Sequence, residues 1–160
     1  MTVDSSIWDR AEETAKADHP HATEADVDKL AQAWQKAYED WAQEIDERRD
    51  AVKPITLAGT YDADDYGVVT INGVRLSPDR SLALRNHSPT GFAWGYGGSG
   101  PAQLALAVLL EAGLSDDEAA KYYQAFKFAH ITRLPQRAGF TTTIDVAAWI
   151  RDHDSRYSKR

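Results

Sequence analysis

The chain has 160 residues, of which 42% are hydrophobic, enough for one domain with a real core plus an appendage. It contains no cysteine, which excludes disulfides, thiol catalysis and cysteine-ligated metal sites. The net charge is −7: residues 1–50 carry −8, with 14 acidic and 6 basic residues, and the rest of the chain carries +1. Direct nucleic-acid binding by residues 1–50 is therefore unfavourable. With no signal peptide and no long apolar run, we expect a cytoplasmic protein that does not enter a membrane.

Two helices are predicted before residue 54. The first runs from Ser5 or Ser6 to about Ala17 and is broken at Asp18–His21, because a residue before proline disfavours helix. The two histidines of that break are too few for a metal site, so we predict an exposed linker and no bound metal. The second helix starts after a capping box formed by Thr23 and Asp26 and reaches about Val52.

An apolar stripe follows the second helix at spacings of three and four residues. It consists of Val27, Leu30, Trp34, Ala37, Trp41 and Ile45. A lone helix of this kind is not stable in water, so the stripe must be covered. Packing within the chain is one possibility. The other is a protein partner or a homodimer, for which Trp34, Trp41 and Ile45 are the candidate interface residues, since tryptophan is enriched in interface hot spots.

From Ile55 the apolar residues alternate, which indicates β-strands. Asn72-Gly73 between two β-prone runs predicts a hairpin. Residues 81–85 read as a further short strand. We therefore predict a small antiparallel sheet of three to four strands.

Three helices are predicted after this sheet. They cover about Gly100–Ala112, ended by Gly113, then Ser115 to about Thr132 after a capping box, and a last helix to about His153. The fold class is therefore α+β, with about three helices packed on the sheet and an N-terminal helical arm. The expected segments are an acidic arm at 1–53, a core domain at 54–154 and a disordered tail at 155–160.

The glycine-rich loop before Pro101 is the most informative segment. A proline in the first helical turn and glycines before it predict a tight loop that points free N–H groups at one spot, which suits an anionic ligand. The loop is neither a P-loop nor a dinucleotide fingerprint. The alternative is a structural turn satisfied by Asn86 or Ser88. The candidate ligand-binding residues are Asn86, His87, Trp94, Tyr96, Gly97, Gly98, Ser99, Gly100 and Gln103.

Catalysis has two weaker candidates, His87 and Ser99. They would need to converge and to be oriented by a carboxylate such as Asp64 or Asp65. The turn from Asp62 to Asp65 lacks the rest of a calcium loop and is predicted to be an acidic turn. Arg75, Arg85, Lys127 and Arg133 could supply cations near the loop. No cofactor is predicted.

The motifs Asn86–Phe92 and Trp94–Gln103, with the following Leu-Ala-Leu-Ala helix, resemble the signature of a family of small bacterial domains of unknown function. The resemblance spans residues 58–152 and includes Tyr122–Lys127, while Ala93 replaces an acidic residue often present there. Such domains are often met in phages, plasmids and other mobile elements. The resemblance implies that context and no established activity.

Three functions follow from these observations. The leading hypothesis is a non-enzymatic binding or regulatory module of mobile-element type, which sequesters or inhibits a host component such as a defence system through its glycine-rich loop. The first alternative is a small enzyme acting on a nucleotide or phosphorylated ligand. The second is an acidic interaction protein or nucleic-acid mimic that acts through its N-terminal helices.

Overall fold

The computed structural model describes residues 23–157. The helix expected at Ser5–Ala17 and the histidine pair at 19 and 21 lie outside this range. The chain divides after Arg48 into two compact units, 1–48 and 49–160, and each is considered by itself.

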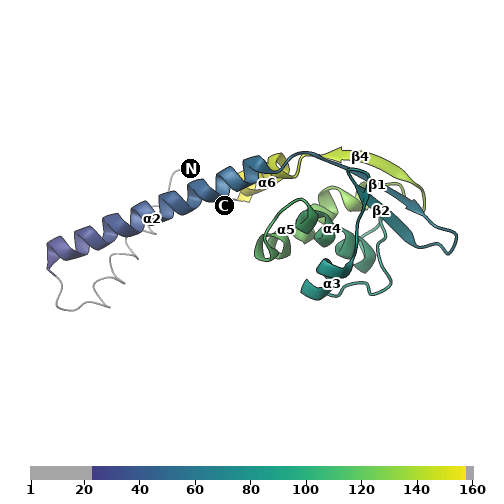
Figure 1. Cartoon of the computed structure of the whole chain (residues 1–160), viewed down its shortest axis with the longest axis horizontal. Helices are drawn as coiled ribbons and strands as arrows, with labels where there is room; N and C mark the ends of the chain where they lie inside the picture. Colours follow the sequence, from purple (N-terminus) through teal and green to yellow (C-terminus); the bar gives the residue numbers. More distant parts are fainter. Residues whose placement is uncertain (1–22, 158–160) are drawn as a thin grey trace. The chain divides into compact units, whose positions relative to one another are not determined.

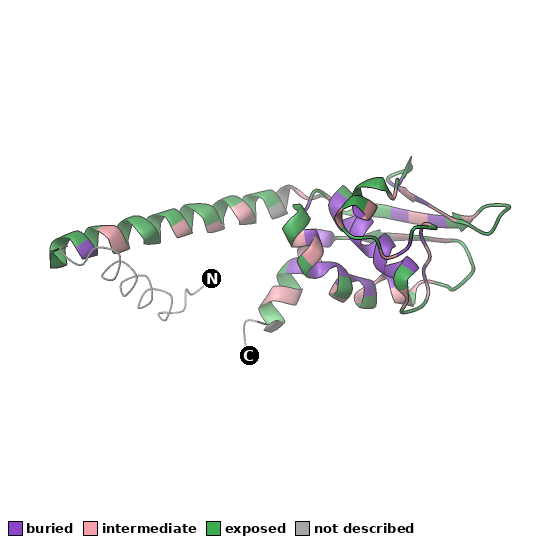
Figure 2. Ribbon diagram, turned by 90° about the horizontal axis from the view of Figure 1, so that it is seen from below, coloured by how far each residue is buried: buried purple, intermediate pink, exposed green. Residues whose placement is uncertain are grey.

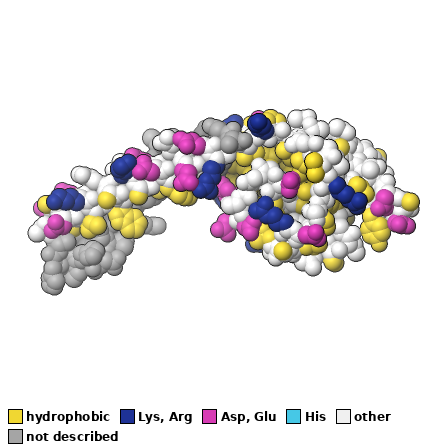
Figure 3. All heavy atoms as spheres, viewed as in Figure 1, with side chains coloured by type: hydrophobic (Ala, Val, Ile, Leu, Met, Phe, Trp, Pro, Cys, Tyr) yellow, Lys and Arg dark blue, Asp and Glu magenta, His cyan; other side chains and the backbone are white. Residues whose placement is uncertain are grey.

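Helix α2 (Glu24–Ala51) confirms the long helix expected before the sheet. Its capping box is present: the Thr23 hydroxyl accepts the Asp26 N–H at 3.3 Å, and the Asp26 carboxylate accepts the Thr23 N–H at 3.1 Å. Acidic and basic side chains are interspersed along α2 (Figure 3). Trp34 and Trp41 of the apolar stripe are 64% and 57% exposed, Ile45 is half-buried and Val27 is buried.

The sheet has four strands in the order β3-β2-β1-β4, and all neighbours are antiparallel. They are β1 (Ile55–Tyr61), β2 (Gly67–Ile71), β3 (Val74–Arg75) and β4 (Phe140–Ile144). The Asn72-Gly73 hairpin is confirmed: both residues have positive φ, 51° and 80°, as a type I′ turn requires. The α+β prediction is also confirmed, with the fourth strand coming from the C-terminal part of the chain.

The strand expected at residues 81–85 is wrong, because this segment forms helix α3 (Asp79–Leu84). The Ser77 hydroxyl accepts the Asp79 N–H, and the Pro78 carbonyl accepts the Leu82 N–H at 2.8 Å, which closes a helical turn. The Ser81 hydroxyl donates to the same Pro78 carbonyl. These local bonds override the apolar alternation from which the strand was predicted.

The remaining helices are α4 (Ser99–Glu111), α5 (Asp116–Ala129) and α6 (Val146–Tyr157), with a 3-10 turn η1 (Ile131–Arg133) after α5. Gly113 ends α4 as predicted: its φ is 99°, and the Leu114 N–H donates to the Leu109 carbonyl in a Schellman motif. Helix α6 continues beyond the expected end at His153. Among the described residues, no helix is long and apolar enough to cross a membrane.

Helix α4 is the centre of the core. Every residue from Gly100 to Leu110 is buried, which is typical of a helix covered on all sides. Helices α3, α4 and α5 lie on one side of the sheet (Figure 1), toward which β1 and β2 direct Leu57, Val69 and Ile71. The strands alternate between buried and exposed residues (Figure 2), so the other face of the sheet is open.

Candidate functional site

The start of α4 leaves backbone donors open. Gly98 is its N-cap and provides no side chain to cap the helix. Within residues 23–157, no hydrogen bond satisfies the N–H groups of Ser99 or Gly100. These donors and the positive end of the helix dipole share one end of α4, where Ser99 is exposed and Gly100 is buried, and a negative charge is favoured there.

Close packing explains the glycines of the loop. A Cβ atom at position 98 would overlap the Tyr96 ring, and one at position 100 would lie 2.8 Å from the Ala93 Cβ. At Gly95, φ is 82°, and its N–H donates to the Ile131 carbonyl at 3.0 Å. The Tyr96 ring thus lies across Gly98, with its hydroxyl directed toward the first turn of α4.

Gln103 fixes the segment that precedes the loop. Its buried carbonyl oxygen accepts the N–H groups of His87 at 2.8 Å and Ser88 at 3.2 Å. Its amide donates to the Ser81 hydroxyl at 2.7 Å, and Ser81 donates onward to Pro78. Gln103 is therefore a structural link that holds His87 beside the first turns of α4, and it is fully buried.

His87 packs against helix α5. Its ring stacks on Tyr123 with centroids 5.1 Å apart, and its buried Nε2 has no hydrogen-bond partner among residues 23–157. Arg85 donates to the Tyr123 hydroxyl at 3.4 Å, with its guanidinium 5.7 Å from the ring centroid. Burial lowers the pKa of His87 below its ordinary value, and the positive charges of Arg85 and Lys127 lower it further.

Lys127 provides a cation at the same end of the helix pair. A short connection, 112–115, joins α4 and α5, which pack side by side, so the last turn of α5 lies beside the first turn of α4. Lys127 is only 6% exposed, and its ammonium lies 4.2 Å from the Phe128 ring centroid. The Phe128 ring borders Gly97 of the loop. Lys127 has no acceptor or acidic partner among the described residues, and its ammonium is not one of the fully buried side-chain nitrogens, so the stem is buried while the ammonium reaches solvent.

The predicted ligand-binding residues divide into three groups. Tyr96, 42% exposed, and Ser99 lie on the surface at the α4 end, together with the backbone of Gly97 and Gly98, whereas Gly100 is buried. Asn86 is exposed and makes no hydrogen bond in the described part of the chain, while Gln103 is internal. Trp94 is fully buried: its Nε1 donates to the Ala138 carbonyl at 3.0 Å, and its ring packs on Tyr61 and Phe140, which makes it a core residue.

The residues named for catalysis are not assembled as a catalytic group. The His87 ring lies against Tyr123, and Asp65 pairs with Arg137 at 2.6 Å. The Asp62 carboxylate accepts the N–H groups of Asp64 and Tyr66, which is an Asx turn, as expected for the acidic turn. Residues 23–157 contain no group of three or more His, Cys, Asp or Glu that could hold a metal ion.

A family model described as a family of unknown function (DUF6166) matches residues 58–152, more than half of the chain. The chain belongs to this family. No curated protein and no solved structure matches it.

The DUF6166 region contains α4, α5 and every residue of the α4 end just described, whereas α2 precedes it. Two contributors were missed at the sequence level. Ser81 was assigned to a strand, and Tyr123 was included only in the motif Tyr122–Lys127. The capping box at the start of α5 could have indicated Tyr123, because the first residue of a helix determines on which face each later residue lies. No neighbouring residue indicated the role of Ser81.

Proposed function

We propose that this DUF6166 domain is a non-enzymatic binding module that holds an anionic group at the N-terminus of α4. The observation that carries the proposal is Lys127, a mostly buried side chain whose ammonium has no acidic partner in the described chain, on the helix that packs beside the unpaired N–H groups of Ser99 and Gly100. Lys127 and Arg85 add positive charge where the helix dipole is already positive. The Ser99 and Tyr96 hydroxyls supply further donors.

His87 would report on such a ligand. Its pKa is lowered by burial and by two neighbouring cations, and a bound anion would counter the effect of those cations. Binding should therefore raise the pKa of His87 and become tighter as the pH falls. A catalytic role is less well supported, because the His87 ring stacks on Tyr123 and Asp65 is committed to Arg137.

Inorganic phosphate is a suitable first probe. We expect it to shift the amide resonances of Ser99 and Gly100 saturably in a nuclear magnetic resonance titration at low ionic strength. Lys127→Gln should weaken this binding about tenfold or more, because a charge-assisted hydrogen bond is lost. The matched control is Lys121→Gln, since Lys121 is an exposed lysine of the same helix whose ammonium donates to Tyr122. Equal weakening by both variants, or no saturable shift, would contradict the proposal.

The biological target of the module is also a proposal. Sequestration or inhibition of a host component fits the phage and plasmid setting that the sequence resemblance implies, and the ligand would then be an anionic group of that component. A cytoplasmic location remains part of this proposal. Binding of phosphate alone would support the site and leave the target to be identified by co-purification.

A protein interface on α2 is a second candidate, favoured by one observation. Trp34 and Trp41 are both more than half exposed, and exposed tryptophans in a stripe suit a homodimer or partner. Native mass spectrometry of the purified chain tests self-association. We expect a dimer that Trp34→Ser and Trp41→Ser together convert to the 17.8 kDa monomer. A wild-type chain that is already monomeric at micromolar concentration would exclude the homodimer.

A further inference from the structure

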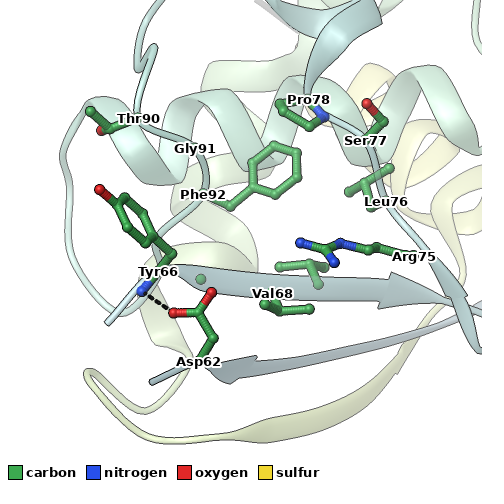
Figure 4. Close-up of a pocket in the computed structure, with 12 residues that line it drawn as sticks. Asp62, Tyr66, Val68, Arg75, Leu76, Ser77, Pro78, Thr90, Gly91 and Phe92 are labelled. Atoms are coloured by element: carbon green, nitrogen blue, oxygen red, sulfur yellow. Dashed lines mark hydrogen bonds between the residues drawn. The ribbon is translucent and has the colours of Figure 1, made fainter. Parts of the chain in front are cut away.

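A second candidate site lies on the edge of the sheet. A pocket of about 470 Å³ opens beside β2, lined by residues of β2, of β3 and the turn after it, and of the segment Thr90–Phe92 (Figure 4). None of its lining residues belongs to the site at the start of α4. The volume lies within the range of small-molecule sites.

The pocket exists because two segments share the edge of β2. Strand β3 pairs only with Thr70 and Ile71, and the Leu76 N–H donates to the Val69 carbonyl just beyond. Farther along, Phe92 bridges to Gly67 and takes the place that a longer β3 would occupy. A gap is left between β3 and Phe92, and Val68 lies at its floor.

Arg75 supplies the positive charge that lines the pocket. Its guanidinium points into the pocket (Figure 4) and makes no hydrogen bond or ion pair with any described residue. Arg80, Arg137 and Arg156 in the same unit each pair with an aspartate. Arginine stays charged at all ordinary pH values and offers a planar fork of donors that matches a carboxylate or phosphate group.

The walls of the pocket are aromatic and apolar. Tyr66 is 55% exposed and stands at the end opposite Arg75, and the Phe92 ring lies between them on the upper side (Figure 4). Pro78 and Val68 complete an apolar surface. Between Tyr66 and Arg75 there is thus an apolar slot that ends at a cation, which suits a flat ring with an acidic substituent.

We propose that this pocket binds a small planar anion, a flat aromatic ring that carries one carboxylate or phosphate group. The anionic group pairs with Arg75, and the ring lies over Val68 against Tyr66 and Phe92. Asp62, whose Oδ1 already accepts the Tyr66 N–H, presents its other oxygen at the far end and favours a ring substituent that donates a hydrogen bond. This site does not depend on the proposed function of the α4 end.

Benzoate and phenyl phosphate test the proposal, with acetate and inorganic phosphate as probes that lack the ring. We expect the two aromatic probes to shift the amide resonances of Val68, Arg75 and Gly91 saturably at millimolar concentration, and the ringless probes to do so at least about tenfold more weakly. The tighter of the two aromatic probes tells whether the natural ligand carries a carboxylate or a phosphate.

Arg75→Gln should weaken binding of the aromatic probe about tenfold or more, whereas Arg156→Gln, which removes an arginine of α6, should leave it unchanged. Tyr66→Ala should weaken it and Tyr66→Phe should preserve it, because the ring is the contact. The proposal is overturned if neither aromatic probe shifts these amides saturably, or if Arg75→Gln binds as the wild type does. Shifts confined to Ser99 and Gly100 that Lys127→Gln removes would also overturn it, by assigning the probe to the α4 end.

Discussion

Helices α4 and α5 are neighbours, but they begin in opposite ways. Ser115 starts α5 with a complete capping box, in which its hydroxyl accepts the Glu118 N–H and the Glu118 carboxylate accepts the Ser115 N–H. Three acidic residues occupy its first turn. Helix α4 starts at Gly98 with no side-chain cap and no acidic residue in its first turn.

The difference shows that the two helices are stabilised by different forces. The start of α5 is exposed and relies on local hydrogen bonds and charge. Helix α4 is buried along nearly its whole length, so packing holds it without a cap. Its first N–H groups, those of Ser99 and Gly100, therefore have no hydrogen-bond partner among the described residues. Substitutions in one helix or the other can therefore separate packing from capping as the source of stability.

The largest effect is expected at Gln103, the polar group within the α4 packing. Gln103→Leu keeps the volume but removes the acceptor of two backbone N–H groups and the donor to Ser81. Because buried groups then lack partners, we expect the free energy of unfolding to fall by about 3 kcal/mol. Urea denaturation measures this. The control is Gln124→Leu on the exposed side of α5, and a loss at Gln103 no larger than at Gln124 would contradict the role assigned to it.

A smaller effect is expected from the two serines at the helix starts. Ser115→Ala removes a cap and should lower the free energy of unfolding by about 1 kcal/mol. Ser99→Ala removes an exposed hydroxyl that caps nothing, so stability should change by less than about 0.5 kcal/mol while phosphate binding weakens. Thermal and urea unfolding of both variants, with phosphate titrations, separate the two roles. Equal destabilisation by both substitutions would remove the contrast between the helices.

The smallest effect concerns pH. Burial lowers the pKa of His87 and of His130, with further lowering by Arg85 and Lys127 for the first and by Arg133 for the second. At a pH between the lowered and the ordinary pKa values, these histidines are protonated in the unfolded chain and neutral in the folded chain. Stability from these groups is complete above the ordinary histidine pKa of about 6.5 and declines as the pH falls toward the lowered values.

Urea denaturation between neutral and mildly acidic pH measures this decline. His87→Gln and His130→Gln should each flatten it, because the substituted residue no longer takes up a proton in the unfolded state. A pH dependence that neither substitution changes would assign the whole decline to the carboxyl groups.

The features that sequence predicted well are set by residues close together in the chain. Both capping boxes, the Asn72-Gly73 hairpin and the Gly113 helix end depend on neighbours within a few positions. The wrong strand prediction at α3 also came from a local pattern. Leu82 and Leu84 alternate as in a strand, whereas Ser77 and Pro78 close a helical turn.

The candidate sites were less predictable, because they depend on contacts between distant segments. The glycine-rich loop drew attention to the start of α4, but sequence alone did not establish that Lys127 is buried beside it. Trp94 alternates with Phe92 and Tyr96 and looked available, yet its indole donates to Ala138 within the core. The Arg75 pocket was not foreseen, since it arises where Phe92 replaces β3 beside Gly67.

The sheet order has a consequence for the order of folding. Strand β1, the first of the sheet, pairs with β4, the last, and Ile55 lies opposite Ile144. During synthesis the β4 side of β1 stays unpaired until nearly the whole domain has been made, and a pairing between such distant segments slows folding. An unpaired strand edge can associate with other chains, so a nascent or truncated chain that ends before Phe140 is at its greatest risk of aggregation.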